Sequence, residues 1–165
     1  MRTARFTAVL LILVSGFATA QQAQSFTKDQ VSSKLRELYP DNADAKKEIA
    51  EALAASGKDH KNVLLVFGAN WCFDCFALDY RFHQAEIQPI VDKNYHVVHV
   101  DIGRNDKNQD LVKKYNIPIE KGIPSLAVLD SKGRTIYTTG EFESARSTDP
   151  QVILKFLDTW KPKQS

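Results

Sequence analysis

Residues 63–75, which read VLLVFGANWCFDC, decide the fold of this chain. Val63–Phe67 is apolar at every position and rich in β-branched residues, which is typical of a strand buried on both faces of a sheet. Gly68 ends this run, and a helix-like pattern begins at the cysteines. Cys72 and Cys75 are the only two cysteines in 165 residues, and they lie where a buried strand gives way to a helix.

The spacing of the two cysteines indicates redox chemistry. Two thiols three positions apart can close into a small disulfide ring and open again without moving the rest of the fold. At a helix N-terminus, the unpaired backbone N–H groups and the helix dipole favour the thiolate, which is the reactive form. A bridge that closes over Phe73 and Asp74 alone would brace little of the chain, because chain-entropy stabilisation grows with loop length. We therefore interpret the pair as a dithiol/disulfide switch.

Residues 1–20 have the pattern of a secretory signal peptide. Arg2 and Arg5 give a positive start, Phe6–Phe17 is apolar, and Ala18-Thr19-Ala20 is a small-residue cleavage site. We predict a cut at the end of this segment and a periplasmic or secreted protein. An uncleaved membrane anchor is the alternative, but the apolar run is shorter than the about 20 residues that a membrane span needs.

The net positive charge of the full sequence comes from residues 1–20. The full sequence carries a net charge of +2, and removing residues 1–20 removes two arginines and no acid, which leaves 20 basic against 20 acidic residues. The charge therefore gives no reason to expect a nucleic-acid partner. We expect a polar lead with helices at residues 21–60, then one domain at residues 61–165.

Helical and strand patterns alternate along the chain. A short helix is predicted at Asp29–Leu38, ended by Pro40, and a second from an N-cap at Asp41-Asn42 to about Ala55, with Gly57 as its stop. The remaining predicted elements are a helix of about four turns from the cysteines to Pro89, a strand at Tyr95–Asp101, a helix at Asp106–Tyr115, a hairpin of Ser125–Leu129 with Thr135–Thr138, and a helix from Asp149-Pro150 to about Trp160.

This order of elements predicts an α/β sandwich with a mixed central sheet flanked by helices. The cysteine pair then lies at the carboxyl end of a central strand, where open α/β sheets place their chemistry.

The segment from Val63 to Lys161 resembles the thioredoxin superfamily, in particular its exported bacterial members. The resemblance rests on Trp-Cys-x-x-Cys after a buried strand, on Gly122-Ile123-Pro124-Ser125 before the next-to-last strand, and on Gly133 and Gly140 around the hairpin. It implies a thioredoxin-like sandwich in which Pro124 is cis and lies across from the cysteines. It also implies that Cys72 is the nucleophile, that Cys75 is the buried resolving thiol, and that the backbone of Ile123 pairs with a substrate segment.

The chain departs from the family pattern near the cysteines. Thioredoxins usually carry a buried acid six residues before the first cysteine, where this chain has Val66. Phe73-Asp74 replaces the usual Gly-Pro, Phe76 stands where a basic residue often follows, and Tyr80 replaces the proline that kinks the helix.

Three residues of the motif besides the cysteines are candidates for the site. We expect Trp71 to shield the cysteines and contact substrate, and Phe73 to be exposed as an apolar substrate contact. Asp74 can raise the pKa of the Cys72 thiol by like-charge repulsion, serve as the base that Val66 does not provide, or cap the first helical turn. We favour the cap with a modest effect on the pKa.

A metal site is the main chemical alternative for the cysteine pair. Structural zinc needs four Cys or His ligands, and only His60, His83, His96 and His99 could complete such a set. His96 and His99 are three apart in a predicted strand, so they point to opposite faces. We predict no zinc and no resident cofactor, and we read the histidines as structural or surface residues. Binding of Cu(I) through both thiols is a further possibility, since soft thiolates suit that ion.

Two functions follow from the sequence. The first is an exported thiol–disulfide oxidoreductase that acts on protein thiols and disulfides. We expect it to act as a reductase, because Ile123 before the proline resembles thioredoxins and reductases. Such an enzyme would draw electrons from a membrane-embedded thiol relay. The second is a thioredoxin-like module that binds Cu(I) or a partner protein with little turnover.

Overall fold

A computed structural model of the chain describes residues 38–163. The predicted signal peptide and nearly all of the predicted helix at residues 29–38 lie outside the described residues. No helix in the described part is long and apolar enough to cross a membrane.

A mixed sheet of four strands forms the centre of the fold. The strands are β1 (Asn62–Gly68), β2 (Tyr95–Asp101), β3 (Ser125–Leu129) and β4 (Thr135–Thr139), in the spatial order β2-β1-β3-β4. β1 runs parallel to β2 and antiparallel to β3, which forms an antiparallel hairpin with β4. The predicted α/β sandwich with a mixed sheet is confirmed.

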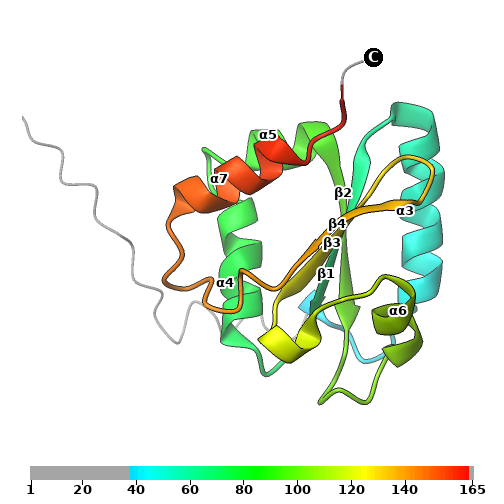
Figure 1. Cartoon of the computed structure of the whole chain (residues 1–165), viewed down its shortest axis with the longest axis vertical. Coiled ribbons are helices and arrows are strands. Elements are labelled where there is room, and N and C mark those ends of the chain that lie inside the picture. Colours follow the sequence, from blue (N-terminus) through cyan, green and yellow to red (C-terminus); the bar gives the residue numbers. More distant parts are fainter. Residues whose placement is uncertain (1–37, 164–165) are drawn as a thin grey trace, which may run out of the picture.

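Helices cover both faces of this sheet (Figure 1). One face carries α3 (Ala45–Asp59) and α6 (Gln109–Lys114), and the other carries α4 (Phe73–Phe82), α5 (Gln88–Asn94) and α7 (Pro150–Thr159). The carboxyl ends of β1 and β2 lie at the lower edge in Figure 1, beside the start of α4. The cysteine motif is therefore held at the end of the central strand.

β1 is buried over its whole length, as its unbroken apolar sequence predicts. Leu64 and Val66 pack into the core under α4, α5 and α7, whereas Leu65 and Phe67 pack into the core under α3 and α6. Alternate side chains of a strand point to opposite faces, so β1 contributes to both cores. This double burial fixes the position of the loop that carries the cysteines.

Both predicted ends of the first described helix are wrong. α3 takes its N-cap from Asp44, whose side chain accepts hydrogen bonds from the backbone N–H groups of Lys46 and Lys47 at 3.1 Å each, and not from Asp41-Asn42. The helix continues through Gly57 and ends only at His60, which takes the left-handed conformation (φ 63°). Glycine lowers helix stability modestly and does not by itself stop a helix that packs on a sheet.

The predicted helix of about four turns after the cysteines is two helices. α4 ends at Phe82, and α5 begins at Gln88 with Pro89 in its first turn. Proline lacks only an N–H that the first turn leaves unpaired, so it starts this helix and does not end the previous one. α6 also begins later than predicted, because Asp106 accepts a hydrogen bond from the N–H of Arg104 within the preceding loop.

The C-terminal elements agree with the sequence. The hairpin extends one residue further than predicted, to Thr139, and Asp149 caps α7 through the N–H of Gln151 at 2.9 Å. Trp160, at the end of α7, is half-buried against the core and stacks on Tyr137 with ring centroids 4.1 Å apart. The strands that frame the cysteine loop are thus placed as the sequence indicates.

Candidate active site

The cysteines lie in the loop and first turn between β1 and α4. Cys72 is the N-cap of α4, and its Sγ accepts a hydrogen bond from the N–H of Cys75 at 3.1 Å. A disulfide joins the two residues, with 5.3 Å between their Cα atoms. Cys72 is 5% exposed and Cys75 is fully enclosed. A thiolate at Cys72 would lie at the positive end of the helix dipole, the placement that favours the reactive form.

The loop before β3 forms the opposite wall of the site. The peptide bond between Ile123 and Pro124 is cis, as predicted. The carbonyl oxygen of Ile123 lies 3.5 Å from Cys72 Sγ. Gly122, at φ 119°, occupies a backbone conformation that favours glycine, and a Cβ there would lie 2.8 Å from the Cβ of Glu143. This backbone stands beside the sulfur that a substrate would meet.

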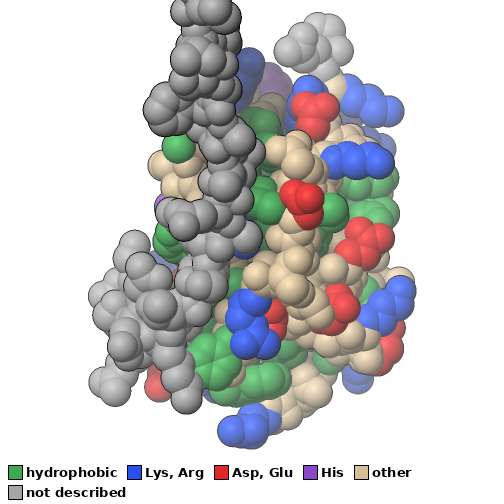
Figure 2. All heavy atoms as spheres, turned by 90° about the vertical axis from the view of Figure 1, so that its left-hand side faces the viewer, with side chains coloured by type: hydrophobic (Ala, Val, Ile, Leu, Met, Phe, Trp, Pro, Cys, Tyr) green, Lys and Arg blue, Asp and Glu red, His purple; other side chains and the backbone are tan. Residues whose placement is uncertain are grey.

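An open groove of about 450 Å³ runs past Cys72. Trp71 and Phe73 line it and are 49% and 41% exposed, which agrees with the predicted exposure of Phe73. Ile123 and Arg146 line it as well. Figure 2 shows hydrophobic side chains gathered near the lower end of one face, with basic side chains next to them. Exposed aromatic surface beside a reactive sulfur can bind an apolar peptide segment.

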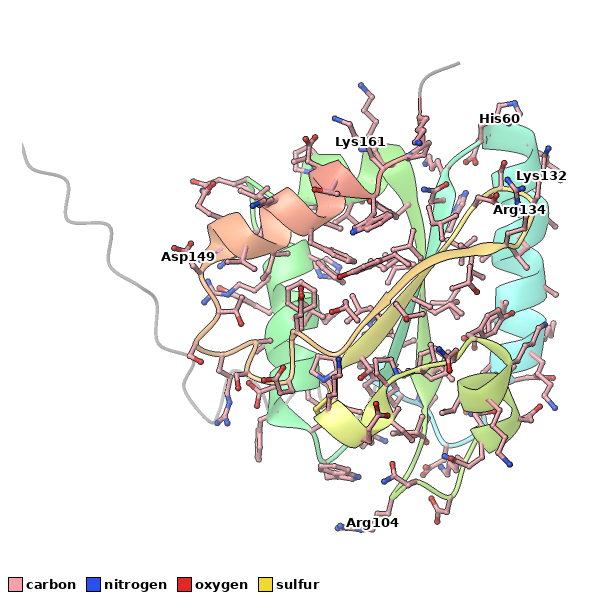
Figure 3. The ribbon with its side chains drawn as sticks, viewed as in Figure 1. His60, Arg104, Lys132, Arg134, Asp149 and Lys161 are labelled. Carbon is pink, nitrogen blue, oxygen red and sulfur yellow. A yellow bond between two sulfur atoms is a disulfide. The ribbon has the colours of Figure 1, made fainter. Side chains whose placement is uncertain are left out.

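Trp71 is held in place by the loop that follows β2. Its indole Nε1 donates a hydrogen bond to the carbonyl oxygen of Gly103 at 2.8 Å, and the Arg104 guanidinium lies 5.8 Å from its ring centre. Arg104 projects from the lower end of the molecule in Figure 3. Asp101 braces the same loop by accepting hydrogen bonds from the N–H of Gly103 at 2.8 Å and from Lys107 Nζ at 2.8 Å.

The preferred interpretation of Asp74 as a helix cap is wrong. The Cys72 sulfur caps α4, and the Asp74 carboxylate accepts hydrogen bonds from the backbone N–H of Arg146 at 2.9 Å and from its Nε at 3.2 Å. The guanidinium also lies 3.2 Å from the second carboxylate oxygen. Sequence reasoning missed Arg146, because no local pattern connects it with a residue 72 positions earlier.

A buried tyrosine that the sequence did not single out packs behind the disulfide. The position at which thioredoxins usually carry a buried acid is the buried Val66, so this chain has no carboxylate there. Tyr39 packs with Cys72, Cys75 and Phe76, and its hydroxyl oxygen has no hydrogen-bond partner in the part of the chain that the structure describes. Burial, with the negative charges of nearby aspartates, holds the pKa of Tyr39 well above its ordinary value.

The four histidines occupy separate places. His60 ends α3, His83 Nδ1 lies 2.8 Å from the carbonyl oxygen of Asp79, and His96 contacts Asp59 at 2.9 Å. His99 packs edge-on against Tyr39, and burial lowers its pKa to about 4. Within residues 38–163 no three or more His, Cys, Asp and Glu side chains form a group that could hold a metal ion.

Comparison with known proteins identifies the family. Residues 44–131 match the family model described as thioredoxin-like. The chain belongs to the thioredoxin-like family. A solved structure, described as a disulphide isomerase from Xylella fastidiosa Temecula1, is 41% identical to it with a TM-score of 0.70, over 73% of this chain and 94% of that one. No curated protein sequence matches this chain.

Two further structures agree with this assignment. A protein described as DsbH oxidoreductase is 26% identical, with a TM-score of 0.53, over 67% of this chain and 78% of that one. The C-terminal domain of DsbD from Neisseria meningitidis in the reduced form is 23% identical, with a TM-score of 0.57, over 72% and 98% of the two chains, and it shows the shared fold. With its Cys72–Cys75 disulfide, this thioredoxin-like protein is a thiol–disulfide oxidoreductase.

Proposed function

We propose that the protein is an exported reductase of protein disulfides that uses the Cys72–Cys75 couple. The unequal exposure of the two sulfurs is the observation that carries the proposal: Cys72 lies at the groove, and Cys75 is enclosed behind it. Cys72 can therefore react with a substrate disulfide, and Cys75 lies behind it, ready to resolve the mixed disulfide. The leader-like sequence of residues 1–20 supports export.

The exchange proceeds in two displacements. The Cys72 thiolate attacks one sulfur of the substrate disulfide, the substrate S–S bond breaks, and the departing substrate sulfur takes up a proton. Cys75, after losing its proton, then attacks Cys72 Sγ, the mixed disulfide breaks, and the second substrate thiolate leaves. The substrate disulfide gains two electrons, and the protein dithiol becomes the Cys72–Cys75 disulfide.

The surface around Cys72 supports a protein substrate. Trp71 and Phe73 present apolar faces to the groove, and Ile123, before the cis bond to Pro124, lines it as well. A peptide segment that carries a cysteine can lie in this groove. To act repeatedly as a reductase in an oxidising compartment, the protein needs an electron donor, for which we propose a membrane-embedded thiol relay.

A turnover assay tests this proposal. The mature protein is expected to accelerate the reduction of insulin by dithiothreitol, and Cys72→Ser is expected to abolish the acceleration. Equal acceleration by Cys72→Ser would contradict the proposal. The reduction potential, measured against a glutathione series, gives the direction. A value near that of thioredoxin, about −270 mV, supports a reductase, and a value near about −120 mV would identify a disulfide donor instead.

Isomerisation is a related activity, because the Xylella fastidiosa relative is described as a disulphide isomerase. An isomerase begins with the same attack by Cys72 but releases a substrate that has rearranged its own disulfides. Refolding of a protein with scrambled disulfides separates the two activities. A Cys75→Ala variant that retained full activity in this assay would favour an isomerase over the proposed reductase.

A further inference from the structure

We propose that the Tyr39 hydroxyl donates a hydrogen bond to the Cys75 sulfur in the reduced protein and so stabilises the Cys75 thiolate. The inference rests on thiol–disulfide exchange at Cys72 and Cys75, and it holds whichever direction the exchange takes. Tyr39 precedes the matched thioredoxin-like segment, and no feature of the cysteine motif points to it.

Tyr39 is anchored against the motif by its backbone and its ring. Its carbonyl oxygen accepts a hydrogen bond from Asn70 Nδ2 at 2.7 Å. Its ring meets those of Phe76 and His99 edge-on, at centroid distances of 6.2 and 5.6 Å. The residue is 1% exposed. These contacts hold the phenol in one position behind the disulfide.

The Tyr39 hydroxyl and Cys75 Sγ both lie next to Gly68. A Cβ placed on Gly68 would overlap the Tyr39 hydroxyl oxygen and would lie 2.7 Å from Cys75 Sγ. Gly68 is part of β1, so its backbone is ordinary strand. A glycine is needed here because a larger side chain would collide with its neighbours. The hydroxyl and the sulfur therefore both border the space beside Gly68.

The hydroxyl lacks a partner in the oxidised protein. It is buried and finds no hydrogen-bond partner among residues 38–163. Burying an unpaired hydroxyl is unfavourable, so such a group is rare without a reason. A disulfide sulfur carries no charge and is a weak acceptor, whereas a thiolate is a strong one. Reduction of the pair would supply the partner that the hydroxyl lacks.

Tyr39 acts as a donor and not as a base. Burial first, and then the negative charges of Asp79 and Asp101, hold its pKa well above the ordinary value, so it keeps its proton. The other titratable group in contact with its ring is His99, which is neutral at pH 7 because burial and the charge of His83 lower its pKa to about 4. Val66 offers no polar atom on the β1 side.

The hydrogen bond serves the resolving step. The Cys75 thiol loses its proton to water, the resulting thiolate attacks Cys72 Sγ, the bond from Cys72 to the substrate sulfur breaks, and the substrate leaves as a thiolate. Tyr39 keeps its own proton throughout. In the opposite direction the same hydrogen bond stabilises Cys75 as the leaving thiolate.

The Tyr39→Phe variant tests the inference, because it removes the hydroxyl and keeps the ring. The pKa of Cys75 is measured in the reduced protein by NMR titration of labelled cysteine Cβ, where only two signals arise. We expect Tyr39→Phe to raise this pKa by about one to two pH units, the effect of one hydrogen bond to a charged group. An unchanged pKa would overturn the inference, whether or not the protein reduces any substrate.

A single-turnover reaction gives an independent readout. A symmetrical aromatic disulfide releases one coloured thiolate when Cys72 attacks and a second when Cys75 resolves the mixed disulfide. Tyr39→Phe is expected to slow the second phase about tenfold at pH 7, in proportion to the lost thiolate fraction, and to leave the first phase unchanged. The difference should close at high pH. Equal slowing of both phases would count against the inference.

Tyr95→Phe is the matched control. Its hydroxyl is buried and donates to the carbonyl oxygen of Leu157 at 2.6 Å, at the end of the sheet remote from the cysteines. We expect it to lower stability and to leave the second phase unchanged. For Tyr39→Phe we expect no loss of stability in the oxidised form, since the hydroxyl has no hydrogen bond to lose. Slowing of the second phase by Tyr95→Phe as well would assign the effect to general loosening of the fold.

Discussion

The carboxylate of Asp74, in the first turn of the helix that carries the cysteines, is bound by both the backbone N–H and the guanidinium of Arg146. The contact joins α4 to the loop before α7 across 72 residues of sequence. The Asp74 side chain is mostly buried, whereas that of Arg146 is largely exposed. The negative charge beside Cys72 is therefore held in a fixed place and partly neutralised.

Arg146→Gln is expected to raise the pKa of the Cys72 thiol. The variant leaves the Asp74 carboxylate less neutralised, and a nearby negative charge disfavours a thiolate. We expect a rise of about half a pH unit to one unit, because the guanidinium is exposed and its effect is screened. The measurement is the pH dependence of alkylation of the reduced protein.

Arg134→Gln is the control for this prediction. Arg134 forms an ion pair with Asp130 in the hairpin turn, at the end of the molecule away from the cysteines (Figure 3). We expect the alkylation profile of Arg134→Gln to match the unaltered protein. If both variants shift the profile equally, the specific contact between Asp74 and Arg146 is not the cause.

Truncation of the two exposed aromatic residues is expected to impair protein substrates selectively. Trp71→Ala and Phe73→Ala each remove an apolar contact from the groove, and we expect KM for a protein disulfide to rise about five- to thirtyfold. Reaction with oxidised glutathione should change little, because so small a molecule needs less of the groove. Val152→Ala removes an exposed apolar side chain of α7 and should leave both values unchanged.

Two glycine-to-alanine changes are expected to have opposite effects on stability. In Gly68→Ala the new methyl group overlaps the Tyr39 hydroxyl and crowds Cys75, so we expect the free energy of unfolding to fall by about 3 kcal/mol. In Gly57→Ala the methyl group meets nothing within 4 Å inside α3, and we expect a gain of about 0.5 to 1 kcal/mol. Urea unfolding of the oxidised proteins measures both, and the same sign for both would refute the packing explanation.

The free energy of unfolding is expected to fall as the pH drops from about 7 towards 4. Burial, and then the charge of His83, lower the pKa of His99 in the folded protein from 6.5 to about 4. The unfolded chain therefore takes up this proton first, which favours unfolding in that range. The difference corresponds to about 3 kcal/mol once the pH is below both values.

Urea titrations at several pH values check the histidine prediction. His99→Gln should remove this part of the pH dependence, whereas His60→Asn, at the exposed end of α3, should retain it. The groups that face His99 are Tyr39 through ring contact and Asp79, whose Oδ1 lies 3.4 Å from Nε2. A His99→Gln variant with an unchanged pH slope would contradict the assignment.

The sequence predicts the strands better than the helix ends. Val63–Phe67 is apolar throughout, short and rich in β-branched residues, which favours a strand buried on both faces. Helix ends depend on weaker preferences, so Asp44 replaces Asp41-Asn42 as the first cap, and Pro89 begins a helix where it was expected to end one. Small differences in free energy separate these alternatives, and packing on the sheet decides them.

The site was predictable where its residues are neighbours in sequence or belong to the family motif, as Ile123 and Pro124 do. Trp71, Cys72, Phe73 and Cys75 lie in one short stretch, so a local pattern predicts them. The partner of Asp74 and the hydroxyl behind Cys75 come from distant segments, and an isolated arginine or tyrosine carries no pattern of its own. Only the folded chain brings them together.

The enclosure of Cys75 has a consequence for the order in which partners bind. Because Cys72 lies at the groove and Cys75 is fully buried, an electron donor and a disulfide substrate of the proposed reductase would both react at Cys72 and would bind by turns. The steady state should then follow double-displacement kinetics, with parallel lines in double-reciprocal plots when donor and substrate are varied. An excess of donor or of substrate should inhibit the reaction by competing for the face around Cys72. The ratio of the two concentrations, and not the supply of either alone, would then set the rate of electron transfer.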